Sequence, residues 1–223
     1  MMKLTSAEFL SGVDARSTCP GCNCSRKYFC YDCRLLMPAV SSFAPKEVQL
    51  PAAVDIVKHT SEKNSKCTGV HCVLTAPSFV RLYDFPEFPD YRQDTNRKTV
   101  LIYPDKKAVS IAEYVEQFGE IDRFVFLDCT WSQAAGMRRD ERLSGLPVIR
   151  LNSYRTQYWR PQHGHTEEDL ATVEAVYYAM REYRDVIKTD SQYGGDFDDL
   201  LFWFDYFHRF VNDGRGLRAL IKE

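Results

Sequence analysis

Apolar stretches of strand length alternate along this chain with segments in which apolar residues recur at helical spacing. Strands buried on both faces of a parallel sheet read as short runs of β-branched and aromatic residues bounded by turn residues. Such runs predict strands near residues 50, 80, 100, 125 and 149. Helices are predicted over 64–75 and 110–118, from 132, from 166 to 187, and over 197–211. This alternation predicts an α/β fold with a mostly parallel sheet flanked by helices.

Two of the predicted helices have a recognisable start. Ser110 and Glu113 have the spacing of a capping box, and Gly119 predicts where that helix ends. Thr166 and Asp169 have the same spacing before the long helix. Its apolar positions predict one buried face, made by Leu170, Val173, Val176, Tyr177, Met180, Tyr183 and Ile187.

The predicted strand over 124–127 leads directly into a polar turn, Asp128-Cys129-Thr130-Trp131, and then into small helix-forming residues. Asp128 is therefore expected at the carboxyl end of a central strand, where open α/β sheets bind their ligands. An aspartate in this position is also a common N-cap of the following helix. The local pattern leaves both interpretations open.

Composition narrows the class of protein. With 223 residues, of which 44% are hydrophobic, the chain can bury one substantial core and carry one small additional module. The net charge of -2 excludes a globally basic nucleic-acid binder, so any RNA contact requires a local patch. We find no signal-peptide pattern, and no apolar run reaches the roughly 18 residues of a membrane span. We expect a monomer without membrane contact, located inside the cell in the nucleus or cytoplasm.

The chain has eight cysteines, and two Cys-x-x-Cys pairs lie close together at Cys19, Cys22, Cys30 and Cys33. Four thiolates at this spacing can surround one zinc ion, and four protein ligands leave no open position, so the metal would be structural. The alternatives are free thiols or a redox pair, and Cys24 can replace Cys22 as a ligand. We predict a zinc-binding module over 15–40 and a main domain over 41–223.

Aromatic residues and arginines alternate after the predicted strand at 149, including Tyr154, Arg155 and Arg160. Rings can stack on splayed bases while guanidinium groups hold phosphates, which would make this segment an RNA contact. The alternative is a partly buried aromatic loop with solvated arginines.

The Asp-x-Thr-Trp motif at residues 128–131 resembles the defining motif of the DTW-domain family, the tRNA-uridine aminocarboxypropyltransferases. Further elements resemble the family in order along the chain. These are His59 to Glu62 with the turn that contains Lys66, Tyr103-Pro104 at a strand end, the aromatic and arginine segment, and residues 170–175. Cys67 departs from the hydroxyl residue that is usual in this family.

The resemblance implies a SPOUT-like sheet, which is knotted in relatives, and S-adenosylmethionine as the ligand. Asp128 would be the general base, and Trp131 would form an apolar wall or stack on a base. Thr130 would hold the loop or a ligand oxygen, and Glu174 would bind the amino group or structure the loop above it. We also expect Tyr103, Leu127 and Leu151 at the cofactor, and Lys66, Tyr154, Arg155 and Arg160 at tRNA.

The implied reaction moves the 3-amino-3-carboxypropyl group of S-adenosylmethionine to N3 of a tRNA uridine and releases methylthioadenosine. Partial burial should bring the pKa of Asp128 up towards about 6–7, the useful range for a base. If Asp128 is only a cap, His59 and Glu62 are the next candidates. Two other functions stay open: a SPOUT-like RNA methyltransferase, and a non-enzymatic RNA-binding module that contains zinc.

Overall fold

A six-stranded sheet is the centre of the structure, a computed structural model that describes residues 2–94, 96–157 and 169–212. Its strands lie in the order β6-β5-β9-β7-β10-β8, and each pairing between them is parallel. They are β5 (Ala53–Lys58), β6 (Val80–Asp84), β7 (Thr99–Ile102), β8 (Val109–Ser110), β9 (Arg123–Asp128) and β10 (Val148–Arg150). The predicted fold class and the five predicted strands are confirmed; β8, with two residues, was too short to predict.

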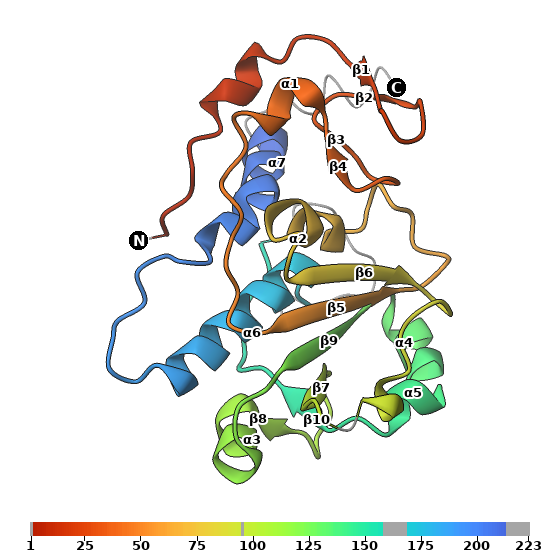
Figure 1. Cartoon of the computed structure of the whole chain (residues 1–223), viewed down its shortest axis with the longest axis vertical. Helices are drawn as coiled ribbons and strands as arrows, with labels where there is room; N and C mark the ends of the chain where they lie inside the picture. Colours follow the sequence, from red (N-terminus) through yellow and green to blue (C-terminus); the bar gives the residue numbers. More distant parts are fainter. Residues whose placement is uncertain (1, 95, 158–168, 213–223) are drawn as a thin grey trace.

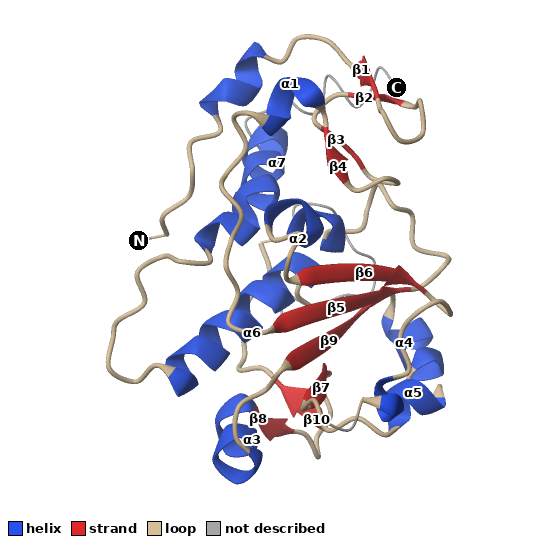
Figure 2. Ribbon diagram, viewed as in Figure 1, coloured by secondary structure: helices blue, strands red, loops and turns tan. Residues whose placement is uncertain are grey.

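Alternating side chains of the strands enter two cores, one on each face of the sheet. Val54 and Ile56 of β5 belong to the larger core, whereas Val57 belongs to the smaller one. The larger core includes side chains of α2 (Gly69–Thr75), α3 (Ile111–Phe118) and α6 (Thr172–Ile187). Residues of α4 (Trp131–Met137), α5 (Glu141–Ser144) and η2 (Tyr91–Gln93) cover the opposite face (Figures 1 and 2).

The helix starts agree only in part with the predictions. α3 has the predicted capping box of Ser110 and Glu113 and ends at Gly119, whose φ of 83° favours glycine. α6 instead begins at Thr172, and residues 169–171 before it are not helical, so the long helix starts later than predicted; the predicted cap residue Thr166 lies outside the described residues. The carboxylate of Glu174 accepts a hydrogen bond from Ala171 N and thereby fixes the start there. Similarly, α2 begins at Gly69 and not at residue 64, because residues 64–66 form a turn.

The Cys-rich segment lies at one end of the molecule beside α7 (Phe202–Asn212) (Figure 1). It contains two antiparallel pairs that were not predicted, β1 (Ser17–Thr18) with β2 (Ser25–Arg26) and β3 (Phe29–Cys30) with β4 (Leu35–Leu36). Three short helices complete the elements of the described residues: η1 (Glu8–Gly12), α1 (Pro38–Ser41) and η3 (Asp198–Leu201).

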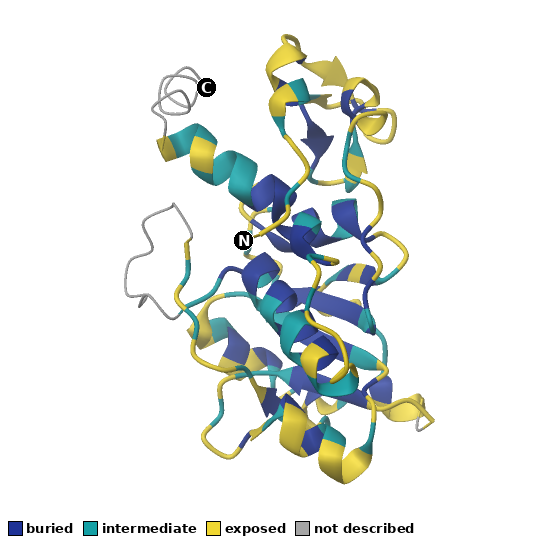
Figure 3. Ribbon diagram, turned by 90° about the vertical axis from the view of Figure 1, so that its left-hand side faces the viewer, coloured by how far each residue is buried: buried dark blue, intermediate teal, exposed yellow. Residues whose placement is uncertain are grey.

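The contact between this segment and α7 is aromatic. The rings of Phe29 and Trp203 lie edge to face with their centroids 5.0 Å apart, and the hydroxyls of Tyr28 and Tyr206 lie 2.7 Å apart. The first residues of α7 are buried here, and its later residues become more exposed (Figure 3). Phe29 and Val54 therefore belong to one core. The division into modules at residue 41 stays a prediction, as does the knot.

In residues 2–94, 96–157 and 169–212, no helix combines the length and the hydropathy that crossing a bilayer requires.

Candidate active site

A pocket of about 480 Å³ opens beyond the carboxyl ends of β5, β7, β9 and β10. This is the edge at which parallel α/β sheets bind ligands. Most of the predicted site residues line it, namely Lys66, Tyr103, Leu127, Asp128, Thr130, Trp131, Leu151 and Tyr154. The sheet therefore brings together residues from four separate parts of the sequence.

Asp128 is half-buried at the end of β9 and has one oxygen without a hydrogen-bond partner. Its Oδ1 accepts a hydrogen bond from Thr172 Oγ1 at the start of α6, whereas Oδ2 is buried and has no such partner among the described residues. Burial raises the pKa of Asp128, while the neighbouring Cys67 thiol, the Thr172 hydroxyl and the charge of Lys58 oppose the rise. The direction agrees with the predicted one.

Thr130, and not Asp128, is the N-cap of α4. Gln133 N donates to Thr130 Oγ1 at 3.5 Å, and Thr130 N donates to Gln133 Oε1 at 2.9 Å, which completes a capping box. Thr130 thus holds the loop, the first of its two predicted roles. The interpretation of Asp128 as a mere helix cap is wrong, and its carboxylate remains directed at the pocket.

Trp131 forms an exposed part of the pocket wall, with 45% of its surface accessible. Its Nε1 donates to Asp169 Oδ1 at 3.0 Å, and its ring lies edge to face with Tyr103 at 5.9 Å between centroids. The guanidinium of Arg138 lies 4.2 Å above the centre of the Tyr103 ring and pairs with Asp105 at 3.3 Å. The indole is therefore fixed in orientation while its surface stays accessible to a ligand.

The loop after β5 supplies the polar side of the pocket. Glu62, Lys66 and Thr68 line it, and Cys67 is buried beside Asp128. His59 accepts a hydrogen bond from Ser61 N at 3.1 Å, the structural role that its position at a strand end favours, and does not line the pocket. Of the two alternative bases, only Glu62 thus reaches the site.

Glu174 lies outside the pocket lining and is 3% exposed. Its carboxylate accepts hydrogen bonds from Thr156 Oγ1 at 2.6 Å, Gln157 N at 2.8 Å and Ala171 N at 2.8 Å. This geometry favours the second role that the sequence indicated, which is to structure the loop above the site.

The three predicted RNA contacts after β10 have different positions. Tyr154 lines the pocket, but one face of its ring stacks on Tyr178 with 3.8 Å between centroids, so only the other face can accept a base. Arg155 is exposed and lies outside the pocket lining. Arg160 lies outside the described residues.

Sequence reasoning missed Thr68 and Thr172 as parts of the site. Both precede or begin helices on the larger-core side, and Thr68 Oγ1 accepts a hydrogen bond from Val173 N at 3.3 Å. A hydroxyl at a helix start was the only local signal, and it indicates a cap as readily as a site residue.

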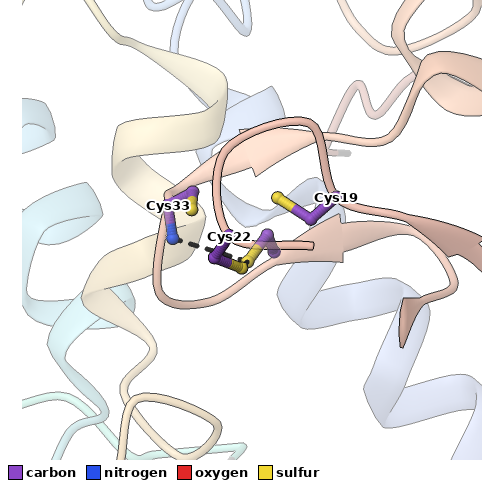
Figure 4. Close-up of side chains that lie close together, drawn as sticks. Cys19, Cys22 and Cys33 are labelled. Atoms are coloured by element: carbon purple, nitrogen blue, oxygen red, sulfur yellow. Dashed lines mark hydrogen bonds between the residues drawn. The ribbon is translucent and has the colours of Figure 1, made fainter. Parts of the chain in front are cut away.

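A second candidate site lies in the Cys-rich segment. The sulfur atoms of Cys19, Cys22, Cys30 and Cys33 all lie within 4.8 Å of one another, and no other such group of metal-binding side chains occurs in the described chain. Figure 4 shows Cys19, Cys22 and Cys33 turned toward one another from the two knuckles. The geometry selects Cys22 over Cys24, and these four residues are able to hold a metal ion.

The surroundings shift the pKa values of two of these cysteines in opposite directions: the hydrogen bond with Cys22, together with burial, raises the pKa of the Cys33 thiol to about 12, whereas the pKa of Cys30 is lowered. Burial opposes ionisation of Cys30, but hydrogen bonds from Cys33 N, Arg26 and Cys22 outweigh it and lower the pKa of this thiol to about 6. Gly21 permits the close approach of the knuckles, since a Cβ there would lie 2.8 Å from Cys33 Sγ. One thiol with a lowered pKa and the tight packing of the knuckles are both compatible with a metal site.

Comparisons with known proteins show the family to which the chain belongs. The DTW domain family matches residues 27–212. The tRNA-uridine aminocarboxypropyltransferase 1 of Xenopus tropicalis is 32% identical, over 96% of this chain and 86% of that protein. The proteins of the same name from Mus musculus and Homo sapiens are 31% and 28% identical, over 90% and 95% of this chain and 79% and 83% of their own lengths.

Among solved structures, the SAM-dependent rRNA:acp-transferase Tsr3 from Vulcanisaeta distributa is similar, with a TM-score of 0.40 and 18% identity, over 73% of this chain and 84% of that chain. The family match covers most of the sequence, including the pocket and two of the four clustered cysteines. The chain belongs to the DTW-domain family.

Proposed function

We propose that this protein is a tRNA-uridine aminocarboxypropyltransferase, which moves the 3-amino-3-carboxypropyl group of S-adenosylmethionine to N3 of a uridine. One observation carries the proposal: Asp128, the aspartate of the family motif, lines an open pocket. Its pKa is raised, and its Oδ2 has no hydrogen-bond partner among the described residues. The relatives that match most of the chain carry the name of this activity.

The two sides of the pocket match the two ends of S-adenosylmethionine. In the sheet, β5 lies on one side of β9, and β7 and β10 lie on the other. The side beyond β7 and β10 contributes Ile102, Tyr103 and Leu151, which suit the adenosyl part. The side beyond β5 contributes Glu62 and Lys66, whose opposite charges suit the ammonium and carboxylate of the amino-acid chain.

Asp128 lies between these sides and would accept the proton of uridine N3. When bound, S-adenosylmethionine supplies a sulfonium whose aminocarboxypropyl carbon is the electrophile. The N3–carbon bond forms as the carbon–sulfur bond breaks; the electron pair remains on sulfur in methylthioadenosine, and the proton remains on Asp128. Trp131 would hold the apolar wall, and Thr130 and Glu174 would keep the surrounding loops in place.

We further propose that the ion held by Cys19, Cys22, Cys30 and Cys33 is zinc. Four cysteine ligands complete a tetrahedral shell, so the ion would stabilise the fold of the knuckles and leave no position for a reactant. For tRNA we propose contacts through Tyr154, Arg155 and Arg160, whereas Lys66, which the sequence assigned to tRNA, would pair with the carboxylate of the amino-acid chain. The monomeric state and the location in nucleus or cytoplasm stay predictions.

The decisive experiment uses S-adenosylmethionine labelled separately in its methyl and its carboxyl carbon. We expect the carboxyl label in tRNA and the methyl label in methylthioadenosine. Methyl label in tRNA would replace this proposal with the methyltransferase, which shares the ligand and the fold. A protein that binds tRNA but shows no calorimetric binding of S-adenosylmethionine would instead be the non-enzymatic RNA-binding module.

A further inference from the structure

We call the segment from Cys19 to Cys33 the metal knuckle. Side chains that lie between or beside its cysteines contact residues in or near the loop that forms the polar wall of the pocket. Asp32 lies between Cys30 and Cys33, and Arg34 directly follows Cys33. Each reaches a residue near the loop that carries Glu62 and Lys66. Two separate bridges therefore connect the metal site to the pocket.

The first bridge is direct. Asp32 Oδ2 pairs with Arg26 Nη2 at 2.7 Å, which fixes the carboxylate within the knuckle. Its other oxygen, Oδ1, accepts a hydrogen bond from Asn64 Nδ2 at 2.6 Å. Asn64 lies between Glu62 and Lys66 in the sequence, so this bond holds the middle of the pocket loop.

The second bridge passes through two strand ends. Arg34 Nη2 pairs with Asp84 Oδ2 at 2.9 Å, and Asp84 Oδ1 pairs with Lys58 Nζ at 2.8 Å. Lys58 Nζ also donates to the carbonyl oxygen of Glu62 at 3.1 Å. The Lys58 side chain is only 4% exposed, so solvent screens its contacts weakly.

The loop is anchored at both ends, because His59 N donates to Asp128 O at 3.0 Å and Cys67 is buried in the larger core. Between these ends, the described backbone hydrogen bonds of residues 60–66 are turns within the loop, from Glu62 N to His59 O at 2.9 Å and from Lys66 N to Lys63 O at 2.8 Å. Turns fix local shape but not the position of the loop relative to the sheet. The two bridges meet the loop at Glu62 and Asn64 and supply that position.

We propose that the metal knuckle positions the pocket wall, with Asp32, Asn64, Arg34, Asp84 and Lys58 as positioning residues that hold Glu62 and Lys66 against the amino-acid chain of the ligand. This inference rests on the proposed function for the identity of that ligand. Breaking a bridge should weaken recognition of the charged chain and leave the adenosyl side of the pocket unchanged.

Two ligands separate these effects, because S-adenosylhomocysteine has the amino-acid chain and methylthioadenosine lacks it. Calorimetry with both would be performed on zinc-loaded wild type, Asn64→Ala, Asp84→Asn and the control Ser65→Ala. In either bridge variant we expect S-adenosylhomocysteine to bind about 5- to 10-fold more weakly, with methylthioadenosine within about 2-fold of wild type. Ser65 is exposed in the same loop and outside the pocket lining, so its variant should match wild type for both.

A swap distinguishes positioning from general damage. Asn64→Asp places a second carboxylate against Asp32 and should weaken S-adenosylhomocysteine at least as much as Asn64→Ala. Adding Asp32→Asn restores an amide facing a carboxylate and should recover most of the loss. The zinc content should stay at one ion per chain in every variant.

Equal weakening of both ligands, no weakening of either, or loss of zinc from Asn64→Ala would overturn the positioning role. With a wild type that transfers the aminocarboxypropyl group, such results would leave the proposed function intact. Selective weakening in a protein that delivers methyl instead would keep the positioning role and overturn the proposed function. A wild type that binds neither ligand would overturn both.

Discussion

Two aspartates on neighbouring strands show how the same side chain is used differently in the middle of the sheet and at its end. Asp55, within β5, is fully buried, pairs with Arg123 Nη1 at 2.6 Å and accepts a hydrogen bond from Tyr91 OH at 3.0 Å. Asp128, at the end of β9, has the Thr172 hydroxyl as its donor and faces a pocket. An ion pair makes the buried charge tolerable at Asp55, whereas Asp128 has no ion pair with any described residue and keeps a carboxylate that can accept a proton.

The strongest test of this contrast is Asp128→Asn, which keeps the shape and removes the basic oxygen. Transfer of carboxyl label to tRNA should fall by about two to four orders of magnitude, the range of general-base catalysis. Calorimetric affinity for S-adenosylmethionine should remain close to that of wild type. If Asp128→Asn stays fully active, the base lies elsewhere, and Glu62 becomes the first candidate because it lines the same pocket.

For Asp55→Asn we expect a loss of stability without a loss of transfer activity. Arg123 would lose its partner at a site where only 18% of its side chain is exposed, which should lower the free energy of unfolding by about 3 kcal/mol. Transfer per folded molecule should not change. Urea denaturation would measure the loss, with Asp205→Asn as the control, since its surface pair with Arg209 should contribute less than about 1 kcal/mol. Equal free energies of unfolding for Asp55→Asn and Asp205→Asn would show that the buried ion pair stabilises the fold no more than the surface pair does.

A smaller effect is expected in the Cys-rich segment, where the close approach of the two knuckles requires a glycine at position 21. In Gly21→Ala the new Cβ would lie 2.8 Å from Cys33 Sγ, so the two knuckles must separate. Zinc affinity, measured by competition with a chelator, should fall by about 10- to 100-fold, as it does when the surroundings of metal ligands are disturbed. Gly12→Ala is the control, because its added Cβ meets no atom within 4 Å. Unchanged affinity in Gly21→Ala would argue against this ligand set.

The smallest effect is expected for Thr172→Val, which tests how the Thr172 hydroxyl influences the pKa of Asp128. The hydroxyl donates to the carboxylate and stabilises its ionised form, so its removal should raise the pKa of Asp128 further. Because the base must be ionised, the acidic limb of the pH profile of transfer should move to higher pH, by about one unit or less. Thr189→Val, an exposed change far along the sequence, should leave the limb in place. A limb that moves to lower pH in Thr172→Val would contradict the assignment.

The same pKa shift affects stability. The pKa of folded Asp128 is raised above its unfolded value, so its contribution to stability is present at low pH and is lost as pH rises through the folded pKa. Asp128→Asn should remove this component, and its unfolding free energy should fall less than that of wild type over that pH range. Equilibrium denaturation at several pH values would show it.

The sequence predicted those parts of the molecule that local patterns determine. Five strands followed from short apolar runs, and Asp128 was placed at the site because it follows a strand end, whereas the places of Trp131 and Tyr103 followed from the resemblance to the DTW-domain family. The start of α6 was predicted too early, because the deciding contact comes from Glu174 to Ala171 while Thr166 offered an equally good cap pattern. The bridges from Asp32 to Asn64 and from Arg34 to Asp84 join residues more than thirty positions apart. Hydrophobic periodicity reports local structure and does not indicate such pairs.

The different environments of two tryptophans give the molecule separate optical reporters. Trp131 has an accessible indole on the pocket wall, so a ligand that covers it should change its fluorescence intensity and wavelength. Trp203 is 1% exposed and lies against Phe29, one residue from Cys30, so its emission should respond to changes in the metal knuckle. In a Trp159→Phe background these are the two remaining tryptophans, and occupancy of the pocket and of the metal site could be followed in one cuvette.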